Sequence, residues 1–178
     1  MLIKRIRVAL ISNGIKRTEY LVKNQIFAQT GENFYFCPRK IPADPKLIRF
    51  HDNVAVATEV LFINHDVIQK VFNFCKDKPV HKYYGCIEIM DNVFIGARST
   101  ILPNVRIGPN VIIAADSVVT KDITESGIYG GNPARKIGDF DELYRKRLEY
   151  TEKYFSGDST DFKLNLWEDF YKEKDRSI

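Results

Sequence analysis

Residues 89–123, IMDNVFIGARSTILPNVRIGPNVIIAADSVVTKDI, decide the fold, because an aliphatic residue returns in them at every sixth position. These aliphatic residues are Ile89, Ile95, Ile101, Ile107, Ile113 and Val119. Four residues after each of them stands a small or β-branched residue, giving the series Val93, Ser99, Val105, Val111, Ser117 and Ile123. Small residues also follow three of the aliphatic positions directly: Gly96, Gly108 and Ala114. A fixed short period of this kind indicates a repeat architecture.

The six-residue period predicts a mainly β fold, a left-handed parallel β-helix. In such a fold three short strands and three turns form one triangular coil, and the aliphatic side chains stack inside it. An ordinary β-meander is the alternative. It alternates with period two and would not place aliphatic residues six apart with turn residues locked to them.

A less regular repeat precedes this block and predicts the first coils. Phe50, Val56 and Phe62 are spaced by six, and Phe36, 14 residues before Phe50, is a further upstream candidate. Residues 66–86 interrupt the frame between the two blocks. Since an insertion that leaves a stack of coils must project from it, we expect a loop there.

The flanking segments have helical patterns. Residues 16–25, 139–154 and 162–174 combine good helix formers with apolar residues at helical spacing. We expect the first two helices to cap the ends of the coil. The chain then divides into residues 1–138, an N-terminal helix with the β-helix, and residues 139–178, a C-terminal helical extension.

Composition and charge narrow the class of protein. The chain has 178 residues, 44% hydrophobic and 28% charged, which is typical of one folded domain. The net charge is +4, of which residues 1–138 hold +7 and residues 139–178 hold −3. This basic surplus suits a small phosphorylated ligand, whereas no basic stripe with interleaved aromatic residues marks a nucleic-acid partner.

Cysteine spacing and the N-terminus indicate the compartment. Cys37, Cys75 and Cys86 match neither a disulfide framework nor a metal-binding knuckle, so a reducing compartment is expected. The apolar run Val8–Ile11 is too short for a signal peptide or a membrane span. We therefore expect a cytoplasmic protein without a membrane span, with peripheral membrane contact left open.

Three stretches resemble one family. They are RTEYL at residues 17–21, LIRFHDNVAVATEVLFINHD at 47–66 and the repeat block with its ending NPARKI at 87–137. Together they are similar to the hexapeptide-repeat acetyltransferases, which include the maltose, galactoside, nodulation and xenobiotic O-acetyltransferases. The resemblance covers roughly residues 16–138 and implies a homotrimer that binds acetyl-CoA between neighbouring coils.

The resemblance also implies site residues. His65 matches the catalytic histidine, which would act as general base on an acceptor hydroxyl. Histidine suits this role because its ordinary pKa of about 6.5 leaves much of it neutral at physiological pH. Asn64 and Asp66 are the candidates for orienting the ring or binding the acceptor. For the coenzyme, matching positions suggest Ala97 and Ala115 at the pantetheine arm, Thr120 and Lys121 near its far end, and Arg135 on a phosphate.

The sequence departs from the family at a few positions. Phe94 stands where Trp is frequent, and Ala114 and Asp116 replace a common Gly-Ala-Gly pattern around Ala115. Gly138 stands where some members carry a second basic residue, which weakens the assignment of the phosphate end.

Several alternatives stay open. The spacing of His51, His65 and His81 lacks the close pair of a zinc site, so no metal is expected. Cys75 has no identifiable basic partner, and a buried or incidental thiol is the better interpretation. The loop aromatic residues either line an acceptor pocket or anchor the loop: Phe72, Phe74, Tyr83 and Tyr84. The predicted function is O-acetylation of a sugar or surface-polysaccharide precursor; the alternatives are a non-catalytic trimeric scaffold or ligand-binding protein and an amino-sugar N-acetyltransferase.

Overall fold

The computed structural model describes residues 1–155 and 162–175. The chain forms two compact units, Met1–Phe140 and Asp141–Ile178. Among the described residues, no helix combines the length and the apolar character that crossing a membrane requires.

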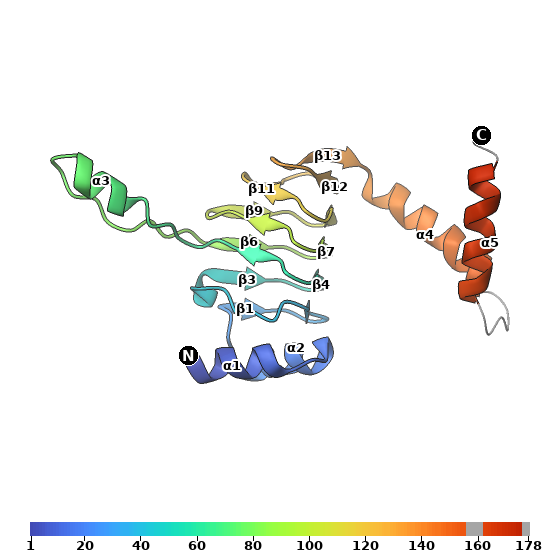
Figure 1. The fold of residues 1–178 in the computed structure, drawn as a ribbon, viewed down its shortest axis with the longest axis horizontal. Helices are drawn as coiled ribbons and strands as arrows, with labels where there is room; N and C mark the ends of the chain where they lie inside the picture. Colours follow the sequence, from blue (N-terminus) through green and yellow to red (C-terminus); the bar gives the residue numbers. More distant parts are fainter. Residues whose placement is uncertain (156–161, 176–178) are drawn as a thin grey trace. The chain divides into compact units, whose positions relative to one another are not determined.

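Three sheets of short strands build the first unit (Figure 1). The first sheet contains, in spatial order, β1 (Gln29–Thr30), β3 (Ile48–Phe50), β6 (Ile87–Ile89) and β9 (Val105–Ile107). The second contains β13 (Arg135–Gly138), β12 (Gly127–Gly130), β10 (Val111–Ile113), β7 (Val93–Ile95), β4 (Val54–Val56) and β2 (Tyr35–Phe36). The third contains β11 (Val118–Val119), β8 (Thr100–Ile101) and β5 (Leu61–Phe62). All strand pairs are parallel except β12 with β13.

The strand register confirms the repeat. Val93 lies opposite Val111 and Ile101 lies opposite Val119, and the members of each pair are three hexapeptides apart in the sequence. One full coil therefore consists of three hexapeptides and contributes one strand to each sheet. The aliphatic residues spaced by six from Ile89 and from Val93 point into the coil. Between residues 87 and 119 they are almost completely buried.

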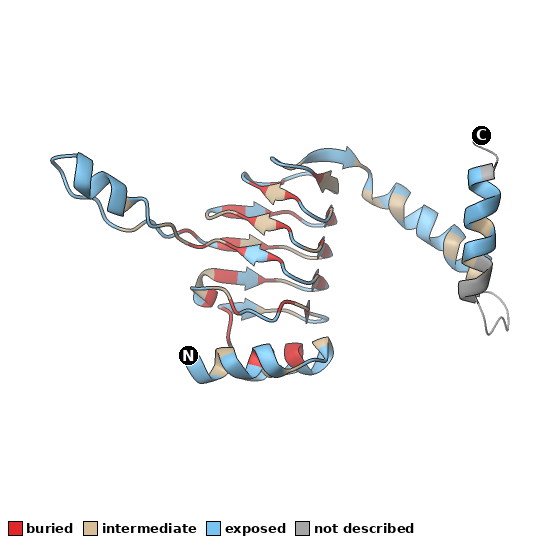
Figure 2. Ribbon diagram, viewed as in Figure 1, coloured by how far each residue is buried: buried red, intermediate tan, exposed pale blue. Residues whose placement is uncertain are grey.

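The register also confirms the insertion. Ile48 of β3 lies opposite Ile87 of β6, and the sequence between them amounts to one coil of three hexapeptides plus the 66–86 loop. This loop leaves the stack and carries a short helix, α3 (Gln69–Cys75), whose residues are largely exposed in the chain (Figures 1 and 2). The coil continues on the far side of the loop without a change of frame.

The core changes composition along the stack. Aromatic rings fill the first two coils, where Phe34 and Phe50 have centroids 4.7 Å apart and Phe27 and Phe50 have centroids 5.0 Å apart. Isoleucine fills the later coils. In Figure 2 buried residues recur along the strands of the stack. The predicted positions Phe36, Phe50 and Phe62 all belong to the core.

Asparagine residues build one corner of the coil. Asn53, Asn92 and Asn110 adopt positive φ angles of 57–60°, a region that asparagine tolerates better than most residues. Their side-chain amides form a ladder with 2.8 Å hydrogen bonds, in which Asn53 donates to Asn92 and Asn92 donates to Asn110. The turns of successive coils are thereby tied to one another.

Two helices cover the N-terminal end of the coil (Figure 1). The predicted helix 16–25 is present as α2 (Gly14–Lys23), and it is docked by Arg17, Thr18 and Leu21, all buried. The Thr18 hydroxyl accepts a hydrogen bond from the Phe36 amide at 2.9 Å. A further helix, α1 (Leu2–Leu10), was missed because its apolar residues are interrupted by Lys4, Arg5 and Arg7.

The second unit contains the two predicted C-terminal helices, α4 (Phe140–Phe155) and α5 (Phe162–Asp175). They form a pair in which Asp169 accepts a 2.5 Å hydrogen bond from the Tyr154 hydroxyl and an ion pair from Lys153 at 2.6 Å. All buried core residues of the described chain lie in the first unit, between Val8 and Ile123.

Candidate active site

His65 follows β5 closely, where the chain leaves the coil to form the 66–86 loop. The two ends of this loop pair beside it: His65 and Tyr84 form an antiparallel bridge, and the Gly85 amide donates to the Asn64 carbonyl at 2.7 Å. The Tyr84 ring stands at 61° to the imidazole, with centroids 5.6 Å apart. The base of the loop thus holds His65 at a fixed place on the coil.

Asp44 is the partner of His65. Its Oδ2 atom forms a hydrogen bond with His65 Nδ1, and both side chains are partly exposed, the imidazole by 23% and the carboxylate by 34%. Asp44 directly precedes the 3₁₀ turn η1 (Pro45–Leu47). An imidazole that donates from Nδ1 to a carboxylate keeps the lone pair of Nε2 available for a proton. The hydrogen bond therefore fixes the orientation of the imidazole ring.

Sequence reasoning missed Asp44. It lies far before His65 in the chain, in a segment outside both repeat blocks, so neither period nor spacing points to it. The only local signal is its place before Pro45, as the first residue of a turn. Only the closing of the coil brings it to the histidine.

The two predicted neighbours of His65 differ in environment. Asn64 is 1% exposed, and neither Oδ1 nor Nδ2 finds a hydrogen-bond partner among the residues that the structure describes. Asp66 is half-buried, and its Oδ1 accepts from the Ile68 amide at 3.0 Å, which starts the loop. A buried amide without partners is costly, by about 1–3 kcal/mol, and is characteristic of functional positions.

Ala97 and Ala115 occupy equivalent turns on successive coils. The Asp116 amide donates to the Ala97 carbonyl at 2.9 Å, so one turn lies on the other. Space is tight here, because a Cβ on Gly96 would come within 2.5 Å of the Ala115 nitrogen. The rim of this corner carries an ion pair between Arg98 and Asp116 at 2.6 Å, and the guanidinium lowers the pKa of the Asp116 carboxyl.

Thr120, Lys121 and Arg135 line one small basic pocket. Its volume is about 220 Å³, and Lys136 and Tyr129 are also part of its wall. Arg135 is exposed, and its guanidinium donates to the neighbouring Ala134 carbonyl at 3.0 Å. Lys136 was not predicted, although it directly follows Arg135. The pocket lies two coils from the level of His65, about 10 Å along the stack at one strand spacing per coil.

The remaining candidates occupy other places. His51 lies on the outer face of the first sheet, where it forms a hydrogen bond with Glu88 at 3.1 Å, and His81 is exposed on the loop. Cys75 is exposed rather than buried. The described residues include no group of three metal-ligating side chains. The four loop aromatic residues are all exposed within the chain: Phe72, Phe74, Tyr83 and Tyr84.

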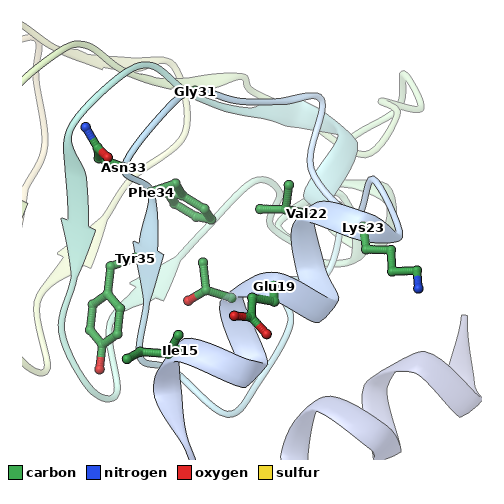
Figure 3. Close-up of a pocket in the computed structure, with 9 residues that line it drawn as sticks. Ile15, Glu19, Val22, Lys23, Gly31, Asn33, Phe34 and Tyr35 are labelled. Carbon is green, nitrogen blue, oxygen red and sulfur yellow. The ribbon is translucent and has the colours of Figure 1, made fainter.

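The first unit has a further pocket, separate from the candidate site residues. An open pocket of about 660 Å³ lies between α2 and the turn that leads into β2, with Ile15, Glu19 and Val22 on the helix side (Figure 3). Its opposite wall includes Phe34 and Tyr35. None of the predicted site residues lines it.

Residues 87–121 match the family model described as bacterial transferase hexapeptide (six repeats). Protein CapG of Staphylococcus aureus is 39% identical over 120 residues, which cover 62% of this chain and 69% of that protein.

Solved structures share the fold. A maltose O-acetyltransferase from Clostridium difficile is 26% identical with a TM-score of 0.57, covering 76% of this chain and 83% of that one. A hexapeptide-repeat acetyltransferase of Vibrio cholerae, complexed with acetyl-CoA, has a TM-score of 0.55 at 22% identity and covers 77% of this chain and 85% of that one. The stretch that matches the family model includes the strand ends that carry Ala97, Ala115 and Thr120.

Proposed function

Because this chain belongs to the hexapeptide-repeat acetyltransferases, we propose that it transfers the acetyl group of acetyl-CoA to a hydroxyl of a sugar or surface-polysaccharide precursor, with His65 as general base. The observation that carries this proposal is the hydrogen bond between His65 and Asp44 at the base of the projecting loop. It would leave Nε2 of a partly exposed imidazole free to accept a proton, which supports the proposal.

The reaction follows from the orientation of the imidazole. Nε2 of His65 takes the proton of the acceptor hydroxyl while the acceptor oxygen attacks the carbonyl carbon of the thioester. The tetrahedral intermediate then breaks its carbon–sulfur bond, and the departing sulfur takes the proton back from the imidazolium. Asp44 stabilises the transient positive charge on the ring and keeps Nδ1 protonated. No covalent acyl-enzyme is formed.

The coenzyme would lie along the stack. Lys121, Arg135 and Lys136 would bind its phosphates, since guanidinium and ammonium groups pair with phosphate oxygens, with Thr120 beside them. The stacked turns of Ala97 and Ala115 lack bulky side chains and would let the pantetheine arm approach the backbone. Their place on successive coils supports this path.

The acceptor would enter beside the loop. Asp66 and the unpartnered amide of Asn64 are the proposed polar contacts, and Tyr84 supplies a ring beside the histidine. The maltose O-acetyltransferase among the structural relatives supports a sugar hydroxyl as acceptor. An amine of an amino sugar would follow the same proton path, and a scaffold without catalysis would bind acetyl-CoA or a ligand without turnover.

The assembly is part of the same proposal. We expect a left-handed coil, a homotrimer in which acetyl-CoA lies between neighbouring chains, and action in the cytoplasm. Sedimentation equilibrium of the full chain measures the assembly, and a monomer in the presence of acetyl-CoA would contradict it.

The test combines binding and turnover. Calorimetric titration with acetyl-CoA should give close to one site per chain, and thiol release should depend on a sugar acceptor. We expect His65→Ala to lower turnover by about 10²–10⁴-fold with acetyl-CoA affinity unchanged, whereas the exposed His81→Ala serves as matched control. Transfer to amines alone would favour N-acetylation, and binding without any turnover would favour the scaffold.

A further inference from the structure

The helix α1 turns its apolar side outward. Leu2, Ile3, Ile6 and Leu10 share one helical face, which we call the apolar stripe, and they are 71%, 81%, 53% and 77% exposed. Val8, on the opposite face, is completely buried. Figure 2 shows the helix as mostly exposed at the N-terminal end of the stack.

Charged side chains, rather than the apolar stripe, attach α1 to the coil. The Arg5 guanidinium donates to the carbonyls of Ile41, Pro42 and Ala43 at 2.6–2.9 Å. Lys4 reaches the Asn24 carbonyl at 3.5 Å. These bonds fix the rotation of the helix, so the outward direction of the apolar stripe is built into the fold. An apolar stripe presented in this way is suited to an apolar environment outside the chain.

The end of the molecule that carries α1 is also the most basic. Residues 1–40 contain eight Lys and Arg and two Glu, a net charge of +6, whereas residues 41–178 have a net charge of −2. Arg7 and Arg39 lie next to the apolar stripe, since Arg7 stands over the Tyr20 ring and Arg39 donates to the Ala9 carbonyl of α1. Apolar and cationic groups side by side are the composition of helices that lie in a membrane interface.

The same end borders the candidate active site. Met1, at the start of α1, lines a pocket of about 490 Å³ together with Asp44, Lys46 and Tyr84. Asp44 and Tyr84 are the two side chains that flank His65. A surface bound by α1 would therefore lie next to the side from which the acceptor is expected.

We propose that α1 docks the protein on the surface of an anionic lipid bilayer, with the apolar stripe in the interface and the basic residues on the lipid phosphates. The proposal goes beyond acetyl transfer and holds for a single chain. If the proposed homotrimer forms, cyclic symmetry turns all three copies of α1 toward the same side, and three weak contacts act together.

Co-sedimentation of the full chain with lipid vesicles tests this proposal. We expect binding to vesicles of phosphatidylcholine with phosphatidylglycerol to exceed binding to pure phosphatidylcholine by at least about tenfold. Raising the salt from about 0.1 M to about 1 M shortens the Debye length from about 10 Å to about 3 Å and should release the protein.

Two matched variants test whether vesicle binding depends on the apolar stripe or on nonspecific hydrophobic adsorption. Ile3→Gln with Ile6→Gln keeps the net charge and should lower vesicle binding by at least about tenfold. The same change at an exposed aliphatic residue of the other unit, Leu148→Gln, should leave it unchanged. Both residues of the double variant are exposed, so its thermal unfolding should match that of the wild type.

Three results would overturn the proposal. One is equal binding to anionic and neutral vesicles, and another is binding that the double variant retains in full. The third is a wild type that ignores vesicles but sediments as a larger assembly than the double variant, which would assign the apolar stripe to a second copy of the chain. Acetyl transfer to a free sugar in the absence of vesicles is measured separately, so a failure here leaves the catalytic proposal untouched.

Discussion

At the scale of single residues, the hydrogen bond between Asp44 and His65 predicts different roles for the two side chains. Asp44 orients the imidazole ring, and His65 transfers the proton. We expect Asp44→Asn to lower kcat by about 10–100-fold, because the amide no longer stabilises a positive imidazole or selects its Nδ1–H form. The change lies on a partly exposed side chain, so the fold and the affinity for acetyl-CoA should stay as they are. Steady-state kinetics with calorimetry measures both quantities.

The matched control is Asp77→Asn, on an exposed carboxylate of the same projecting loop. It should change neither kcat nor KM. If Asp44→Asn raised only KM, Asp44 would be an acceptor contact rather than a positioning residue.

The residue scale is also where the sequence is least informative. His65 became a candidate because it matches the catalytic histidine of the resembling family and lies at the end of the first repeat block, just before the projecting loop. Asp44 could not be predicted, because the partner of a side chain across a coil is determined by three-dimensional closure and leaves no spacing in the chain. Lys136 was overlooked although it directly follows Arg135 in the sequence. The buried state of Asn64 is equally invisible, since its residue type indicates a surface.

At the scale of the elements, the asparagine ladder predicts a graded loss of stability. Asn92→Ala removes two amide hydrogen bonds and places at a φ of 60° a residue that tolerates this conformation less well than asparagine, so we expect the free energy of unfolding to fall by about 2 kcal/mol. Asn92→Gly loses the hydrogen bonds but accepts the turn, and should cost about 1 kcal/mol. Urea unfolding measures both, and equal losses would show that the turn conformation does not matter.

The outer face of the first sheet predicts a dependence on pH. The hydrogen bond from His51, together with the Arg106 guanidinium at 2.8 Å, lowers the pKa of the Glu88 carboxyl below its ordinary value of 4.5. A lowered folded pKa means that the unfolded chain binds the proton more tightly. The resulting stability is therefore present above about pH 4.5 and disappears as the pH falls through the folded pKa.

Glu88→Gln should accordingly unfold at a lower temperature than the wild type near pH 7. The difference should shrink as the pH decreases below 4.5. A difference that stays constant from neutral to acidic pH would assign the effect to packing instead of charge.

Most of the elements could be predicted from the sequence. The strands of residues 87–119, the two coils before them and the projecting loop follow from the period of six and its single interruption. The helix α1 was missed for a physical reason. Lys4, Arg5 and Arg7 interrupt its apolar residues, and the sequence does not show that the apolar side of the helix turns away from the coil.

At the scale of the whole molecule, the division into two units predicts an independent first unit. Residues 1–140 contain every buried core residue of the described chain. A chain that ends after Phe140 should keep its thermal unfolding transition within a few degrees, about 1 kcal/mol or less, because no core side chain is lost. Differential scanning calorimetry and acetyl-CoA titration of both lengths measure this.

Loss of the transition in the shorter chain would show that α4 and α5 complete the core. Loss of acetyl-CoA binding with an unchanged thermal unfolding transition would instead indicate that the second unit contributes to the acetyl-CoA site.

The uninterrupted register on both sides of the 66–86 loop also bears on how such enzymes diversify. Since Ile48 and Ile87 lie opposite each other across the base of the loop, we expect a loop of another length or sequence to leave the coil unchanged. The donor-side turns lie on later coils and would be inherited unchanged. If the loop borders the acceptor as proposed, exchanging this one segment would change the acceptor while the rest of the coil stays the same.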